Sequence, residues 1–335
     1  FEIVKHASAV GARTFCGSSG VGWFYAFEAI AVTAGLRLPV VAMVGNRALD
    51  DPGAFGVEHN DALAVRDLGW LLYWVATAQE AMDMALMAWR IAEDSQCFLP
   101  FALSCDGSFL THSQAIVNVP TQEKVNRYLP VYDRGSLLLH PDNPITIAPQ
   151  ANEDWLMEIR RQSDEAMHQT PAVIKKAYQE FKDIFGRGDP SPFIEEYMTD
   201  DADIILVGMG TLALPVKVAV RQMRQEGKKV GFLRVKYFRP FATDEIREAL
   251  GKCKAVAVID RDFSLGSPSY GGVLFNDIRS ALYPLDARPN MYNFIAGLGG
   301  REVRVRDVND MVNMTQDALD TGKKELDTTW INVRE

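Results

Sequence analysis

Cysteine is scarce in this chain of 335 residues, and its placement excludes several kinds of metal site. The four cysteines, Cys16, Cys97, Cys105 and Cys253, form no Cys-x-x-Cys pair. The chain therefore cannot by itself supply the four-thiolate nest that an iron–sulfur cluster or a structural zinc ion ordinarily takes. We expect small buried thiols in a reducing, cytoplasmic environment, and we assign no metal ligands.

Long apolar runs and an excess of positive charge are also missing. No stretch reaches about 18 consecutive uncharged apolar residues, so the sequence indicates no membrane span. The formal net charge of -9 argues against binding nucleic acid through bulk charge. No signal peptide is visible, and the chain opens at Phe1 with a sequence typical of the middle of a domain. We therefore expect the N-terminus of that domain to be truncated.

The chain does contain an alternation of strand-like and helix-like segments, which predicts the fold class. Residues 39–45 form a branched apolar run typical of a buried parallel strand, and residues 77–95 carry apolar side chains at helical spacing. A helix is expected at 18–35, with Gly35 as its C-terminal cap. A second alternation later in the chain includes a helix that Thr243 caps. The pattern predicts an α/β fold with two parallel-sheet domains.

A long connector is expected between the two domains. We place the first domain at 1–120, the connector at 121–200 and the second domain at 201–325. Prolines interrupt the first part of the connector, which predicts an irregular surface segment. A charged helical stretch follows, and we expect Thr170-Pro171 to interrupt it.

Two glycine-rich turns suggest phosphate binding, but neither carries a complete motif. VGMGT at 207–211 lacks the third glycine of a dinucleotide fingerprint, so a tight strand-to-helix turn explains it better. The missing fingerprint also disfavours a nicotinamide-dependent dehydrogenase. For GLGGRE at 297–302, a plain turn and an anion-binding loop both stay open.

A guanidinium follows the strand predicted at 39–45. Ligands of parallel α/β sheets bind at the carboxyl ends of the strands, and this strand delivers Arg47 there. Arginine presents a planar fork that binds a carboxylate in bidentate fashion. A structural salt bridge to Asp50, Asp51 or Asp67 is an equally good explanation of the pattern alone.

Other polar residues stand in predicted turns, at a helix start or after another strand. Asp50 and Asp51 precede a Pro-Gly pair, which allows a sharp and mobile turn, although a solvated turn has the same pattern. Ser18 and Ser19 stand at a helix start, where they either cap the helix or face a cofactor. Structural or turn roles are the simpler explanation for three further residues, His59, Asp106 and His112.

Seven separated blocks, in order, resemble the α subunit of 2-oxoacid:ferredoxin oxidoreductases. The resemblance runs from about His6 to Asp310, and the blocks are GARTFCGSSGVGWFYAFE, LRLPVVAMVGNRAL, EHNDALAVRDLGW, AEDSQCFLPFALSCDGSFLTHS, KVGFLRVKYFRPFATDEIREAL, KAVAVIDRD and YNFIAGLGGRE. It implies an oxidative decarboxylase that uses thiamine diphosphate. Residues 1–120 resemble the pyrimidine-side thiamine-binding domain, and residues 201–325 resemble a transketolase C-terminal-like domain.

The resemblance also implies partners. A β-type subunit would share the thiamine diphosphate and hold its diphosphate and Mg²⁺, while [4Fe-4S] clusters in cluster-binding subunits would pass electrons to ferredoxin. The glutamate that contacts the pyrimidine in this family would align upstream of Phe1.

The family's substrate-carboxylate arginine aligns with Arg47, but the next residues depart from the pyruvate-type RALSAP pattern. The version here, RALDDPGAFG, resembles oxalate oxidoreductase, and it implies that oxalate is converted to CO2. Arg47 would bind the carboxylate, Phe55 and Asp51 would line the pocket, and Asp50 would swing in after carbon–carbon cleavage. Two alternatives stay open: a pyruvate or other 2-oxoacid oxidoreductase forming acyl-CoA, and a non-catalytic scaffolding subunit.

Overall fold

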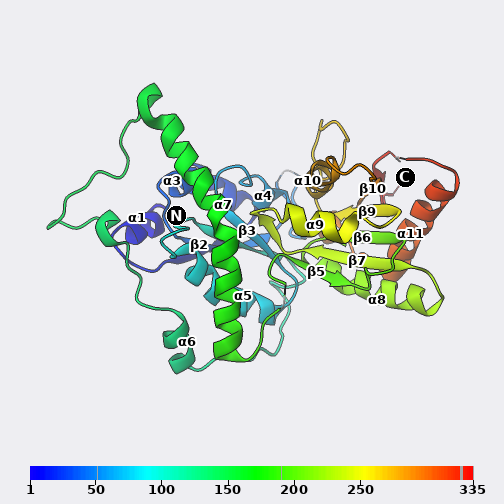
Figure 1. Cartoon of the computed structure of the whole chain (residues 1–335), viewed down its shortest axis with the longest axis horizontal. Coiled ribbons are helices and arrows are strands. Elements are labelled where there is room, and N and C mark those ends of the chain that lie inside the picture. The colour runs from blue at the N-terminus through cyan, green and yellow to red at the C-terminus, as the bar shows by residue number, and fades with distance from the viewer. Residues whose placement is uncertain (51, 190, 325–326, 335) are drawn as a thin grey trace.

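The computed structural model describes residues 1–50, 52–189, 191–324 and 327–334. These residues form two mostly parallel sheets flanked by helices, which confirms the predicted α/β class. The N-terminal half and the C-terminal half lie side by side, and the long green helix α7 crosses the N-terminal half (Figure 1).

The first sheet has five strands in the order β1-β2-β4-β3-β8. Four of them run parallel and β8 runs antiparallel to β3; their bounds are β1 Phe15–Ser18, β2 Val41–Asn46, β3 Leu71–Val75, β4 Phe101–Asp106 and β8 Tyr237–Arg239. Strands β3 and β4 are buried along their whole length, as expected where helices cover both faces of a parallel sheet. Strand β8 comes from residues that we placed in the second domain, so the two halves are interleaved. Our domain boundaries stay predictions.

The helices of the N-terminal half include α1 (Glu2–Ala9), α4 (Asn60–Leu63) and α5 (Ala78–Ala92). The single helix expected at 18–35 is in fact two helices, α2 (Gly20–Tyr25) and α3 (Phe27–Gly35), separated at Ala26. Gly35 is the last helical residue and not a left-handed cap. Arg37 takes the left-handed conformation instead, with φ of 53°, and its N–H donates to the carbonyl of Ala34 at 3.0 Å.

The connector contains a short helix, α6 (Gln122–Tyr128), and a long one, α7 (Asn152–Phe185). The expected interruption at Pro171 is wrong, because the 34-residue helix α7 is continuous through this proline. Its buried side chains pack against the N-terminal half on both sides of the proline, and such tertiary packing outweighs the lost backbone hydrogen bond. Within the described ranges, neither this helix nor any other has the length and apolar composition needed to cross a membrane.

The second sheet has the order β11-β10-β9-β6-β7-β5, and only β5 is antiparallel to its neighbour. Its strands are β5 Ile194–Tyr197, β6 Ile204–Gly208, β7 Val230–Val235, β9 Ala255–Asp260, β10 Asn290–Ile295 and β11 Thr329–Trp330. Helix α8 (Ala213–Gln225) packs with α11 (Val305–Asp320), and α9 (Thr243–Leu250) packs with α10 (Val273–Leu282). Thr243 is not the cap of α9, because it is already the first helical residue and Ala242 holds the cap position.

Asp106, at the carboxyl end of β4, joins the two halves. Its buried carboxylate lies 2.8 Å from His59 Nε2 and accepts hydrogen bonds from Arg261 Nη1 at 2.6 Å and from the Thr211 N–H at 2.9 Å. Burial favours the neutral acid, but His59 and Arg261 hold the pKa of Asp106 well below its usual range. The VGMGT segment is thus a strand-to-helix turn, as expected, and its Thr211 N–H is bonded to Asp106.

Candidate functional site

Strands β1 and β2 are neighbours, and the segments after their carboxyl ends form the candidate site. Ser18 ends β1, Ser19 holds the N-cap position before helix α2, and Arg47 follows β2 directly. Ser18 and Ser19 are half-buried, and the Ser19 side chain makes no capping hydrogen bond. A Cβ on Gly45 would lie 3.7 Å from the Cβ of Ser19, so the two strand ends are in contact. The structure therefore brings the predicted serines and arginine to the same edge of the sheet.

The Arg47 guanidinium is only partly engaged. Its Nη2 lies 3.6 Å from Asp50 Oδ2, and its Cζ lies 5.5 Å from the ring centroid of Phe55. The Nε atom is buried, and no described residue accepts a hydrogen bond from it. Asp67, the other acid considered as a partner, lies instead near Arg66 and Arg239. Because the Arg47 side chain is 23% exposed, an incoming carboxylate has access to the guanidinium at its exposed part and not at the buried Nε.

The segment between Arg47 and Gly56 is a loop closed at its base. The N–H of Ala48 donates to the carbonyl of Gly56 at 3.0 Å. The Asp50 side chain is 40% exposed and Phe55 is 80% exposed, so the loop carries an acid and an aromatic ring near the surface. Asp51, the other predicted pocket residue, lies outside the described residues.

The C-terminal half supports the far end of this loop. A Cβ on Gly56 would overlap the carbonyl oxygen of Gly299, and the Gly300 N–H donates to the carbonyl of Val57 at 3.3 Å. Gly297, Gly299 and Gly300 all have positive φ, which makes this turn a tight one. The GLGGRE segment is therefore a packing turn against the loop of Arg47, and the N–H groups of Gly300 and Arg301 are already bonded within the chain.

Asp61, on helix α4, lies beneath the site and was not singled out from the sequence. It is fully buried, and its carboxylate accepts hydrogen bonds from the N–H groups of Gly20 at 2.9 Å and Arg47 at 3.1 Å. It also accepts from Asn46 Nδ2 at 2.9 Å. No spacing rule identifies an acid whose partners are mostly backbone groups from two other segments.

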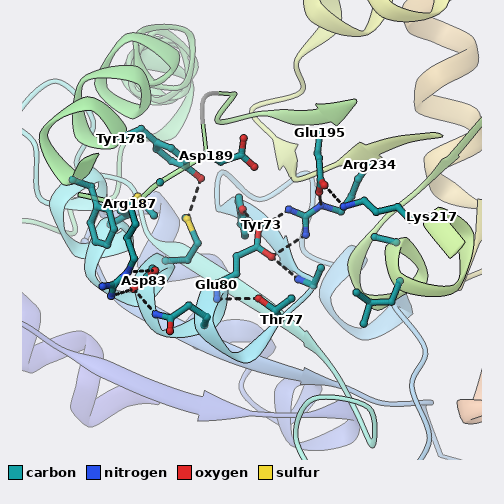
Figure 2. Close-up of a pocket in the computed structure, with 18 residues that line it drawn as sticks. Tyr73, Thr77, Glu80, Asp83, Tyr178, Arg187, Asp189, Glu195, Lys217 and Arg234 are labelled. Carbon is teal, nitrogen blue, oxygen red and sulfur yellow. Dashed lines mark hydrogen bonds and ion pairs between the residues drawn. The ribbon is translucent and has the colours of Figure 1, made fainter. Parts of the chain in front are cut away.

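A separate cavity of about 380 Å³ lies between α5, α7, α8 and β7 (Figure 2). Glu80 accepts hydrogen bonds from Arg234 at 2.6 and 2.8 Å, and Asp83 accepts from Arg187 at 2.7 and 2.9 Å. Burial opposes ionisation of Glu80, but Arg234 outweighs it and lowers the pKa of Glu80 to about 2. These charges neutralise one another inside the chain, and none of the described residues from 47–50 and 52–56 lines the cavity. We therefore take the Arg47 edge as the functional site.

Metal-ligand clusters are not found in the part of the chain that the structure describes: no group of three His, Cys, Asp or Glu side chains there could hold an ion. The four cysteines are free, and Cys97, Cys105 and Cys253 are buried.

Two family models match the chain. Residues 1–179 match "Pyruvate flavodoxin/ferredoxin oxidoreductase, thiamine diP-bdg", and residues 202–308 match "Pyruvate:ferredoxin oxidoreductase core domain II". Among curated relatives, the pyruvate synthase subunit PorA of Pyrococcus abyssi is 40% identical over 328 residues, covering 98% of this chain and 82% of the relative. The ketoisovalerate oxidoreductase subunit VorA of the same organism is 37% identical with the same coverage.

Solved structures share the fold. The 2-oxoglutarate:ferredoxin oxidoreductase of Magnetococcus marinus aligns with a TM-score of 0.59 at 16% identity, covering 94% of this chain and 55% of that chain. A split-gene transketolase aligns with a TM-score of 0.52 at 14% identity, covering 93% of this chain and 79% of that chain. At such identities the likeness concerns the fold alone.

The buried acid Glu58, next to the site, makes stability depend on pH. Burial, with the nearby Asp61 and Asp262, raises the pKa of Glu58 to about 7 from 4.5. The folded chain thus retains a proton that the unfolded chain releases, so this stabilisation is complete below pH 4.5 and is lost as the pH rises through 7. Glu58→Gln should raise the free energy of unfolding at pH 8 by about 1–3 kcal/mol, and change it little at pH 4.

Urea unfolding of the two proteins at both pH values checks this expectation. Glu153→Gln, an exposed acid at the start of α7, serves as the control and should change neither value by more than about 0.5 kcal/mol. The same difference for Glu58→Gln at both pH values would contradict the account.

Proposed function

Since the chain belongs to the pyruvate flavodoxin/ferredoxin oxidoreductase family, as a 2-oxoacid:ferredoxin oxidoreductase α subunit, we propose that its complex oxidatively decarboxylates oxalate. The observation that carries this proposal is the Arg47 fork at the strand ends, with Asp50 placed 3.6 Å from it. Arg47 binds the carboxylate that stays on the substrate. From the family resemblance, iron–sulfur clusters in partner subunits would carry the electrons to ferredoxin.

The residues present fit the pyrimidine side of a thiamine diphosphate site. The half-buried Ser18 and Ser19 and the partly exposed Arg47 guanidinium supply hydrogen-bond donors at this edge, and Gly20 places no side chain against the guanidinium. When bound, the cofactor supplies an electron sink that no side chain can replace. From the family resemblance, we assign the diphosphate, Mg²⁺ and the [4Fe-4S] clusters to β-type and cluster-binding subunits.

The substrate carboxylate competes with Asp50 for the Arg47 fork. Two carboxylates at one guanidinium repel each other, so binding of oxalate displaces Asp50 from its position near Nη2. The Pro52-Gly53 pair in the loop allows this displacement. After the carbon–carbon bond breaks, Asp50 returns, and its charge destabilises the remaining carboxylate and promotes release of the second CO2. Oxalate thereby yields two CO2 and two electrons, and coenzyme A is not required.

Pyruvate is the second candidate substrate, and the relatives favour it. The PorA protein that is 40% identical over 98% of this chain is named a pyruvate synthase subunit, and this supports pyruvate more directly than oxalate. The relative VorA is named a ketoisovalerate oxidoreductase subunit. What favours oxalate is Asp50, because an acid beside the fork assists release of a charged fragment but has no such task when the fragment is an acyl group.

Anaerobic turnover of the assembled complex tests the proposal. We expect oxalate to support viologen reduction in the absence of coenzyme A. The rate of viologen reduction with pyruvate or 2-oxoglutarate should not exceed the rate with oxalate. Arg47→Ala should lower kcat/KM by about 10²–10³-fold, since a bidentate charged contact is lost, and Arg47→Lys should recover only part of it.

Arg161→Ala, at an exposed arginine of α7, is the matched control and should keep wild-type turnover. Turnover only with pyruvate and coenzyme A would transfer the assignment to pyruvate. Unchanged kcat/KM in Arg47→Ala would instead favour a subunit that only scaffolds its partners.

The variant Asp50→Asn tests whether Asp50 acts in release of the second CO2 and not in binding of oxalate. Asparagine keeps the size of the side chain but removes its charge, so we expect kcat on oxalate to fall about tenfold or more while KM does not rise. Asp142→Asn, an exposed acid in the connector, provides the control. Steady-state kinetics of the complex measure both constants, and an unchanged kcat for Asp50→Asn would remove Asp50 from the mechanism.

A further inference from the structure

The Asp61 carboxylate holds both backbone segments of the candidate site. Its Oδ2 accepts the N–H of Gly20, which follows β1, and the N–H of Arg47, which follows β2. Its Oδ1 accepts Asn46 Nδ2 and the N–H of Ala62 at 2.7 Å. One buried side chain therefore fixes the spacing between two strand ends that belong to different parts of the sequence.

Gly20 also touches the guanidinium itself. Its φ is 48°, and a Cβ placed there would lie 2.6 Å from Arg47 Nε and 3.2 Å from Nη2. The Arg47 fork thus rests on the bare Cα of Gly20. Because Asp61 accepts hydrogen bonds from the N–H groups of both Gly20 and Arg47, it fixes the position and orientation of the Arg47 guanidinium relative to the Gly20 Cα.

We propose that Asp61 is a positioning residue for Arg47, which holds the fork in the geometry that a substrate carboxylate requires. This inference rests on the proposed function, because it assumes that Arg47 binds the substrate. Bidentate contacts tolerate displacements of only about 0.5 Å, so a loss of the Asp61 clamp weakens substrate binding without removing any substrate contact. A carboxylate is needed, because its two oxygens both act as acceptors, whereas asparagine presents N–H to one pair of donors.

A double-mutant cycle in the assembled complex, with oxalate and then pyruvate as the probe, tests the inference. In the wild-type background, Asp61→Asn should raise KM for the substrate that is turned over by about 10–100-fold, with a smaller change in kcat. In the Arg47→Ala background, the same substitution should change KM less than twofold, because the fork that it orients is gone.

The outcomes separate this inference from the proposed function. Equal losses in both backgrounds mean that Asp61 acts only on the fold, and they overturn the inference while Arg47 keeps its role. An Arg47→Ala enzyme with wild-type KM and kcat overturns the proposed function, and the inference with it.

Gly20→Ala supplies a second test in case Asp61→Asn does not fold. Its matched control is Gly135→Ala, since Gly135 has φ of 56° and no atom within 4 Å of an added Cβ. Both variants carry the same backbone strain, but only Gly20→Ala displaces the guanidinium. We expect KM to rise about tenfold or more in Gly20→Ala and to stay at the wild-type value in Gly135→Ala. Equal KM values in the two variants would overturn the inference.

Discussion

The candidate site depends on one buried charge, the carboxylate of Asp61. An ionised acid without solvent is costly unless several donors surround it, and here three backbone N–H groups and an asparagine amide do so. Burial still raises the pKa of Asp61, despite these hydrogen bonds. Three of these donors, the N–H groups of Gly20 and Arg47 and the Asn46 amide, belong to the two strand ends that form the site. The interactions that satisfy the acid therefore also fix Arg47 and Gly20.

The second constraint is the junction between the halves. Asp106 connects β4 to Arg261 and Thr211 of the C-terminal half, and the turn at Gly299 and Gly300 packs against Gly56. The loop that carries Asp50 and Phe55 is therefore attached to the first sheet at one end and supported by the second half at the other. The Asp50 side chain itself is 40% exposed, as the displacement that we propose for it requires.

Much of this architecture could be predicted from the sequence, because strand–helix alternation and strand-end chemistry are local signals. Arg47 was expected after a strand end and Ser18 and Ser19 at a helix start, and the structure brings these positions to one sheet edge. The continuity of α7 through Pro171 could not be predicted, because it depends on tertiary packing. Strand β8 pairs across the two halves, and Asp61 bonds backbone groups far away in the sequence, so neither leaves a periodic pattern. The fold does not distinguish oxalate from pyruvate, because the proposal of oxalate rests on a few residues of the loop after Arg47.

The most direct test of the central claim is a structure of the assembled complex with a bound 2-oxoacid, in which the distance from the Arg47 guanidinium to the substrate carboxylate is measured. The account predicts two N–H···O contacts of about 2.7–2.9 Å, with Asp50 displaced from the fork. A substrate carboxylate bound elsewhere, with Arg47 still facing Asp50, would contradict it.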